Sequence, residues 1–499
     1  MKRDPVAAFV DGRRFRLLVG GDLVDATDGA TFETFNPTTG SLLTHAPAAS
    51  PKDVDRAVLA AKVAQPAWRR LGVRGRREVF ERFGVAIAAR AEELAALDAV
   101  DAGNPIGAMS RDVAIALRTL KDWPALALAL TSDVIPEAGT SGDLHFTLYE
   151  PYGVVARIIP FNHPAMFAIS GVLPALIAGN AVVLKAAEQT PLSALVLGEI
   201  AAEVFPPGVL NVLTGGAQTG DALVTHPDVR RIAFTGSTAT GRTIQRRAAE
   251  TGVKHVSLEL GGKNALIIFP DADLAASVAG AFDGMNITSC QGQSCGSTSR
   301  VLVHRSLYDG FLDGLRDRIS RVRVGVAYDD ETEMGPVVSA SQRDRILAYV
   351  ELGRAEGARL VTGGGPVDGV SAGGYFVAPT AFADVQMDMR IAQEEIFGPV
   401  VCVIPWDGYD EMLVAANGVE YGLSASVWTN DLHLALGTAQ ALEAGYVWIN
   451  ETAKHFWGTP FGGTKASGVG REESKDELIS YYELKAVHAI LRDPRTRLP

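Results

Sequence analysis

The chain has 499 residues, which is too long for one ordinary hydrophobic core and predicts two or three domains. Hydrophobic residues make up 47% of it and charged residues 21%, a balance typical of globular proteins. The formal net charge of −12 disfavours nucleic acid and anionic membranes as partners, because both repel an acidic protein.

The three cysteines, Cys290, Cys295 and Cys402, are too few and odd in number for a disulfide scaffold, and they favour a reducing compartment. The sequence has no CxxC pair and its nine histidines show no ligand spacing, so we expect no metal site. The N-terminal stretch lacks the apolar segment of a signal peptide. Together these features predict a cytoplasmic protein.

The expected elements change in character along the chain. Residues 1–50 carry the turn signals of short strands, and residues 51–129 have the apolar spacing of helices. From 153 to 258 short aliphatic strands alternate with helical segments, and a second such stretch begins near 262. This alternation predicts an α/β fold with parallel-rich open sheets. Two strand-like pieces, 141–149 and 478–491, are expected to pair outside their own domains.

The uncharged run 165–184 is long enough to span a membrane. Pro174, Gly179 and Asn180 interrupt it, and a β-branched segment follows the Gly-Asn turn. We therefore expect a buried helix, a turn and a buried strand, and no membrane span.

A candidate anion site lies where the strand Arg231–Phe234 runs into Thr235-Gly236-Ser237 and then into a helix. A glycine turn at a helix N-terminus can bind a phosphate group. The spacing to Gly241 is not the G-x-G-x-x-G fingerprint, so an ordinary strand–helix turn is the alternative interpretation.

Lys185 ends another predicted strand and Glu188 follows three residues later, at the edge where open α/β sheets bind ligands. A carboxylate there can accept hydrogen bonds from a ribose diol and would repel a 2′-phosphate, which favours NAD over NADP. A surface ion pair is the alternative. At a third strand end, Pro160 and Pro164 fix the backbone around Asn162, whose amide could donate to an oxyanion or cap a helix.

Glu259 and Cys295 are the candidate base and nucleophile. Glu259 ends an apolar strand just before a Gly-Gly pair, a context that raises a carboxyl pKa and suits a general base. Cys295 has small polar neighbours, which argues against an inert core thiol. A thiol with a separate carboxylate suits chemistry through a thioester, since its formation and its hydrolysis need different groups.

Taken in order, these segments resemble the aldehyde dehydrogenase superfamily over nearly the whole chain. The matching motifs are Pro160-Phe161-Asn162, Lys185-Ala186-Ala187-Glu188, Phe234-Thr235-Gly236-Ser237, Leu258-Glu259-Leu260-Gly261-Gly262-Lys263, Gly292-Gln293-Ser294-Cys295 and Glu395-Ile396-Phe397-Gly398-Pro399. The resemblance implies a nucleotide-binding domain (1–130 and 150–258), a catalytic domain (259–470) and a small β oligomerisation arm (131–149 and 471–499). It also implies a homodimer or homotetramer.

By this resemblance Cys295 is the nucleophile, Glu259 directs the deacylating water, and Asn162 is a donor of the oxyanion hole. The expected cofactor is NAD, with NADP the less favoured choice. The residues expected to contact it are Phe161, Lys185, Glu188, Gly236, Ser237, Glu395 and Phe397.

The sequence also departs from the family pattern. Ala186 replaces a usual proline, which predicts a looser loop. Ser170 and Gly171 stand where many members have bulky aromatic residues and a lysine, which predicts a wider substrate tunnel. The residues expected to line that tunnel are Phe167, Ser170, Phe456 and Trp457, with His455 beside them.

The predicted reaction is oxidation of an aldehyde to a carboxylic acid with NAD, through a thiohemiacetal and a thioester. One alternative is a CoA-acylating semialdehyde dehydrogenase, which Glu259 disfavours. Another is a catalytically silent dinucleotide-binding protein on the same fold. Aromatic residues near the tunnel mouth favour apolar or aromatic aldehydes.

Overall fold

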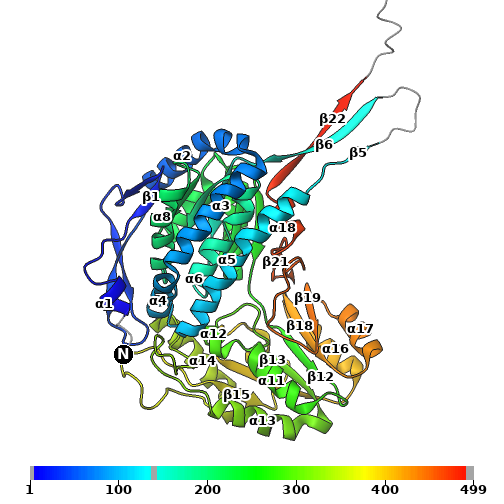
Figure 1. Cartoon of the computed structure of the whole chain (residues 1–499). Coiled ribbons are helices and arrows are strands. Elements are labelled where there is room, and N and C mark those ends of the chain that lie inside the picture. Colours follow the sequence, from blue (N-terminus) through cyan, green and yellow to red (C-terminus); the bar gives the residue numbers. More distant parts are fainter. Residues whose placement is uncertain (1–4, 136–142, 491–499) are drawn as a thin grey trace, which may run out of the picture.

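The computed structural model describes residues 5–135 and 143–490. Two sheets covered by helices lie one above the other, and a narrow β arm projects from the upper one (Figure 1). This is the α/β class, with two parallel-rich sheets and an arm, that the sequence predicts. In the described residues no helix is both long and apolar enough to cross a membrane.

The first sheet has the strand order β2-β1-β9-β8-β7-β10-β11-β21. Its five central strands are parallel, so their carboxyl ends meet at one edge. These strands are β9 (Leu210–Leu213), β8 (Ala181–Lys185), β7 (Val154–Ile158), β10 (Val229–Thr235) and β11 (His255–Glu259). The outer strands are antiparallel to their neighbours: β1 (Leu17–Val19), β2 (Asp22–Val24) and β21 (Gly468–Val469).

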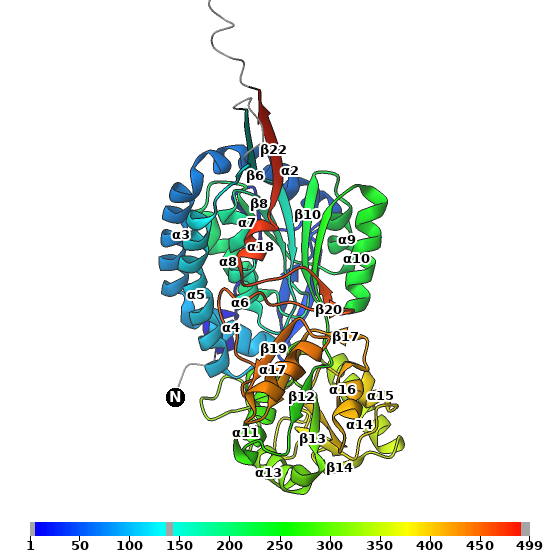
Figure 2. The same cartoon turned by 90° about the vertical axis from the view of Figure 1, so that its right-hand side faces the viewer.

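Helices cover both faces of this sheet (Figure 2). One face carries α9 (Ala217–Thr225) and α10 (Thr238–Thr251). The other face carries α3 (Gly72–Ala89), α4 (Ala91–Ala102), α5 (Ile106–Ala129), α6 (Pro164–Ser170), α7 (Leu173–Ile177) and α8 (Leu192–Val204). The helix α2 (Pro51–Arg70) packs on β8 and α9. The uncharged run 165–184 forms two short helices, α6 and α7, where one was predicted, followed by the predicted turn and the strand β8.

The second sheet has the order β14-β15-β16-β13-β12-β18-β19 and is parallel except for β14. Its strands are β14 (Arg359–Thr362), β15 (Thr380–Ala383), β16 (Val400–Trp406), β13 (Arg300–His304), β12 (Ala265–Ile268), β18 (Ser424–Trp428) and β19 (Tyr446–Ile449). Separate apolar clusters fill its two faces. They pack against α11 (Leu274–Gly284) and α13 (Tyr308–Ser320) on one side, and α14 (Ala340–Ala355) and α16 (Tyr409–Asn417) on the other.

The remaining elements are shorter. They are α1 (Pro5–Phe9), β3 (Thr31–Phe35), β4 (Leu42–Pro47), α12 (Ile287–Cys290), α15 (Arg390–Gln393), β17 (Tyr421–Gly422), α17 (Leu432–Ala441), β20 (Thr464–Lys465) and α18 (Lys475–Ile479).

The arm is built from the two strand-like pieces that the sequence singles out, and they pair with each other. The strand β22 (Tyr482–Ala489) runs antiparallel to β6 (Leu144–Pro151) over its full length, and β5 (Val134–Ile135) adds to β6. Residues 141, 142 and 491 of the predicted pieces lie outside the described residues. Because both partners belong to one chain, this pairing needs no second subunit.

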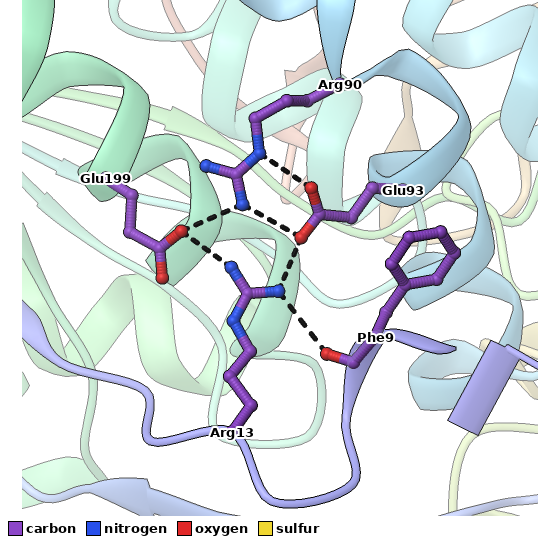
Figure 3. A network of polar contacts seen from close by, with 5 residues as sticks. All are labelled: Phe9, Arg13, Arg90, Glu93 and Glu199. Atoms are coloured by element: carbon purple, nitrogen blue, oxygen red, sulfur yellow. Dashed lines mark hydrogen bonds and ion pairs between the residues drawn. The ribbon is translucent and has the colours of Figure 1, made fainter. Parts of the chain in front are cut away.

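The segment before β1 is fixed to the first layer by a cluster of four charges (Figure 3). Arg13 pairs with Glu93 on α4 and with Glu199 on α8, the latter at 2.6 Å. Arg90 pairs with the same two carboxylates at 2.6 and 2.8 Å. Each carboxylate therefore lies between two guanidinium groups, an arrangement that restrains all three segments more than an isolated surface pair would.

Candidate active site

A cavity of about 760 Å³ opens at the carboxyl ends of β7, β8, β10 and β11. It is the crevice in which parallel α/β sheets bind ligands. Its lining includes most of the residues predicted from the sequence: Phe161, Asn162, Phe167, Lys185, Glu188, Gly236, Ser237, Glu259, Cys295, Glu395 and Phe397. Residues from both sheets thus face one cavity.

The anion-binding end of the cavity is the N-terminus of α10. Ser237 caps this helix, since its hydroxyl accepts a hydrogen bond from Thr240 N at 3.3 Å. Gly241, in the first turn, has no room for a side chain because a Cβ there would lie 2.6 Å from Leu260. The first N–H groups of a helix lack acceptors within it, so the N-terminus of α10 is suited to a phosphate.

Lys185 and Glu188 line another part of the same cavity. Lys185 ends β8 and is 7% exposed, and burial lowers its pKa while the charge of Glu188 opposes that effect. Glu188 itself is exposed. The predicted looseness of the loop between them is wrong at Ala186, which is fully buried and donates its N–H to Leu213 O at 3.1 Å. A proline could not make that hydrogen bond.

Glu395 and Phe397 close the cavity from the side of the second sheet. Glu395 accepts a hydrogen bond from Gly262 N at 3.0 Å, and burial raises its pKa to about 6. Phe397 has a positive φ of 59°, a backbone conformation that bulky residues rarely adopt. Its ring meets Phe161 edge to face at 5.6 Å. The two rings, one from the loop after β7 and one from the loop before β16, form an apolar part of the cavity wall.

Cys295 lies in the loop after α12 and is half-buried. Asn264 fixes the loop by donating to Cys295 O at 2.7 Å. Burial, with the charges of Glu395 and Glu259, holds the pKa of the thiol far above its usual range. The half-buried sulfur thus faces the cavity, and its surroundings favour the protonated thiol.

Asn162 is not the cap of the helix that follows it, because the cap position of α6 belongs to His163. Asn162 is buried and its amide donates to Gln293 O at 2.9 Å, which points it toward the Cys295 loop. Asn104 donates to the carbonyl of Asn162 at 2.7 Å and fixes its backbone. The helix-cap interpretation is thus excluded, and the oxyanion-donor role stays a prediction.

Glu259 ends β11 and is 5% exposed, and its Oε2 has no hydrogen-bond partner in the described part of the chain. Burial raises its pKa well above the usual range, and the charge of Glu472 adds to the shift. Two glycines enclose it. A Cβ on Gly462 would lie 2.8 Å from Glu259 Oε1, and one on Gly468 would lie 2.1 Å from Leu258 O.

Arg157 is a residue that the sequence reasoning missed. It is buried on β7 and binds Glu472 at 2.7 Å. A Cβ on Gly171 would lie 2.7 Å from Arg157 Nε, so the guanidinium fills the space beside this glycine. A wider tunnel was expected at Gly171, and that expectation is wrong because Arg157 occupies the space. Gly171, the residue that follows α6, was the signal in the sequence that could have pointed to Arg157.

The predicted tunnel residues are not all brought together. Phe167 lines the cavity with Cys295, whereas Ser170, Phe456 and Trp457 are absent from its lining. The hydroxyl groups of Ser170 and Thr119 lie 3.2 Å apart. Trp457 meets Trp123 of α5 edge to face at 4.6 Å, and Phe456 is 53% exposed. These three residues lie outside the cavity, and their role stays a prediction.

Comparison with known proteins places this geometry in a family. The model of the aldehyde dehydrogenase family matches residues 23–487. Aldehyde dehydrogenase tropH of Talaromyces stipitatus is 45% identical over 91% of this chain and 89% of its own length. Betaine aldehyde dehydrogenase 1 of Rhizobium meliloti is 42% identical over 94% of this chain and 96% of its own.

Among solved structures, an NAD⁺ complex of an aldehyde dehydrogenase from Bacillus cereus superposes with a TM-score of 0.94. It has 39% identity, and the match covers 99% of both chains. The chain belongs to the aldehyde dehydrogenase family, and it is an oxidoreductase of that class.

The raised pKa of Cys295 gives a first prediction. Only the thiolate reacts with iodoacetamide, so alkylation of Cys295 in the ligand-free protein should be slow at pH 7. Its rate should rise about tenfold per pH unit up to pH 9, because the thiolate fraction grows in that proportion below the pKa. Mass spectrometry of the labelled peptide measures the alkylation rate at each pH. Cys290 and Cys402 are buried and serve as internal controls. A rate that levels off between pH 7 and 8 would contradict the raised pKa.

Proposed function

We propose that this chain oxidises an aldehyde to a carboxylic acid with NAD, through a covalent adduct on Cys295. The observation that carries the proposal is the shared cavity. A half-buried thiol, a buried carboxylate with an unpartnered oxygen and a fixed Asn amide meet beside a helix N-terminus suited to a pyrophosphate. Glu188 favours NAD over NADP, and the NAD⁺ complex of the Bacillus cereus relative supports the same choice.

In this proposal Gly236, Ser237, Lys185 and Glu188 hold the pyrophosphate and adenosine ribose, and Glu395 holds the second ribose. Phe161 and Phe397 would flank the nicotinamide ring. When bound, the oxidised nicotinamide would supply the hydride acceptor. Its positive charge would also lower the pKa of Cys295, against the effect of the nearby carboxylates.

The chemical steps use this chain's own groups. Cys295 Sγ loses its proton and attacks the carbonyl carbon, while Asn162 Nδ2 and the Cys295 N–H donate hydrogen bonds to the oxyanion. Loss of hydride from the thiohemiacetal leaves a thioester. Glu259 then takes a proton from water, whose oxygen attacks the thioester carbon and releases the acid and the thiol. Burial suits Glu259 to this step, because a raised pKa makes the carboxylate a stronger base.

The Cys295→Ala variant tests the covalent step. It should bind NAD⁺ with a Kd within about threefold of the wild-type value but form no NADH from any aldehyde, a loss of at least about 10⁴-fold in kcat. Isothermal titration with NAD⁺ and NADP⁺ measures the Kd of each cofactor. Absorbance at 340 nm with a panel of aldehydes measures NADH formation. Cys402→Ala, which removes a buried thiol outside the cavity, is the matched control. Substantial turnover by Cys295→Ala would disprove the nucleophile assignment.

The Glu259→Gln variant tests the base. A burst of NADH equal to the enzyme concentration should remain, while steady turnover should fall by about 10²–10⁴-fold because water attack loses its base. In the wild type the deacylation rate should rise with pH as Glu259 loses its proton, and this rise should be absent from the variant. Stopped-flow absorbance separates the two phases. Loss of the burst would instead place Glu259 in acylation, and a rate restored by CoA would favour the CoA-acylating alternative.

For assembly we propose a homo-oligomer joined through the arm. The arm exposes Leu144, Leu148 and Leu484, and β22 has a free edge among the described residues. Sedimentation velocity of the wild type should show a dimer or tetramer. The Leu484→Asp and Leu148→Asp variants should shift toward monomer, whereas Leu432→Asp, on α17 and also exposed, should not. A wild-type monomer would refute the proposal.

A further inference from the structure

Part of the cavity lies between two helices of the first layer. The helices α9 and α10 pack side by side on one face of the first sheet (Figure 2). Each of them turns one face toward the cavity, because its lining residues recur at intervals of three and four. These residues are Ala217, Gly220, Asp221 and Val224 of α9, and Thr240, Thr243, Ile244 and Arg247 of α10. The cavity therefore includes a slot between the two helices.

The slot suits a flat ring. Val224 and Ile244 are 2% and 6% exposed and give the slot apolar walls. A Cβ on Gly220 would meet no atom within 4 Å, so there is open space beside the backbone of α9. Gly216 caps α9 and lies next to Glu188, since a Cβ on it would be 3.5 Å from Glu188 Oε2. A dinucleotide whose adenosine ribose is held by Glu188 would thus have its base in the slot.

An ion pair joins the two helices at this slot. Arg247 of α10 donates to both carboxylate oxygens of Asp221 on α9, at 2.6 and 2.9 Å. Its third nitrogen donates to Glu250 at 2.6 Å, which fixes the plane of the guanidinium group. Asp221 is about 7 Å further along the axis of α9 than Gly216. Asp221 and Arg247 line the cavity, whereas Glu250 does not.

The Asp221 carboxylate keeps its charge and part of its capacity to accept hydrogen bonds. The hydrogen bonds from Arg247 hold the pKa of Asp221 below its usual value. A carboxylate has about four lone-pair sites, and Arg247 uses two of them. The Asp221 side chain is 46% exposed, so a ligand in the slot can reach its other lone pairs. A donor group on that ligand would be attracted, and an acceptor oxygen would be repelled.

We propose that Asp221, held in place by Arg247, makes the protein selective for the adenine base of the dinucleotide. The exocyclic N6 amino group of adenine is a hydrogen-bond donor and would bind the Asp221 carboxylate. Hypoxanthine has an acceptor oxygen at the same position, which the carboxylate repels. The inference rests on the proposed NAD-dependent oxidation and adds the selectivity for the base to it.

The test compares NAD⁺ with nicotinamide hypoxanthine dinucleotide, whose base differs at position 6. The wild type should favour NAD⁺ by about tenfold in Kd and in kcat/KM, the usual effect of a hydrogen bond to a charged group. In Asp221→Asn the ratio should fall to about one, because an amide can accept from the amino group or donate to the oxygen. Isothermal titration measures the two Kd values. Absorbance at 340 nm with one saturating aldehyde measures kcat/KM for each dinucleotide.

Two further variants separate recognition of the base from support of the helices. Glu250→Gln removes the other carboxylate bonded to Arg247, which lies outside the cavity lining, and should leave the ratio unchanged. Arg247→Lys keeps the charge but holds Asp221 through a single ammonium group, so part of the preference should remain. Both side chains of the ion pair are partly exposed, and such a pair adds little to stability, so these variants should fold.

A wild-type ratio near one would overturn the inference. So would an Asp221→Asn variant that loses affinity for both dinucleotides equally, because the ion pair would then only support the helices. NADH formation from NAD⁺ by the wild type, abolished in Cys295→Ala, tests the proposed oxidation independently of the ratio between the two dinucleotides.

Discussion

The pairing of β21 with the edge strand β11 is the constraint on which the active site depends. Two residues of the late segment 460–470, Gly468 and Val469, pair with Glu259 and Leu258 at the end of the first sheet. The approach is so close that only glycine fits at 468, where φ is 144°. Gly462 then leaves just enough room for the Glu259 carboxylate. Backbone pairing of the two strands therefore holds Glu259 at the cavity that Cys295 also lines.

The regular part of the fold is readable from sequence because it follows local rules. Buried parallel strands such as β7, β8 and β10 are short aliphatic runs bounded by turn residues, and they form where those patterns predict. Asn162, Lys185 and Ser237 each follow such a strand, so their meeting at one edge follows from parallel pairing alone. The cavity thus brings together residues that are far apart along the chain but that all lie at the carboxyl ends of parallel strands.

What the sequence does not reveal depends on contacts between segments distant in the chain. The segment 460–470 shows an unusual mixture of glycine and charge, but its pairing with β11 has no local signature. Arg157 reads as an interruption of an apolar strand, and only Gly171 opposite it explains where the side chain goes. In the sequence, Ala186 predicts a looser loop, but in the structure its buried N–H donates to Leu213 O. Each case is a tertiary contact that overrides a local preference.

The site concentrates carboxylates in a poorly solvated space, and this sets its chemistry. Glu259, Glu395 and Glu477 all have raised pKa values because burial disfavours their charged forms. Arg157, a buried cation that acts on both Glu259 and Glu477, is bonded to Glu472 rather than to the thiol. Burial in this space therefore favours the neutral forms of its carboxyl groups.

The C-terminal segment completes the interior of the first sheet. Arg231, buried on β10, stacks on the ring of Tyr481 and donates to the carbonyl and hydroxyl oxygens of Ser480, each at 2.7 Å. Asn180 donates to Tyr481 O at 3.0 Å. A guanidinium and an amide buried in the first sheet therefore find their acceptors 249 and 301 residues further along the chain. The first sheet can complete its native hydrogen bonding only once residues 480 and 481 have docked on it.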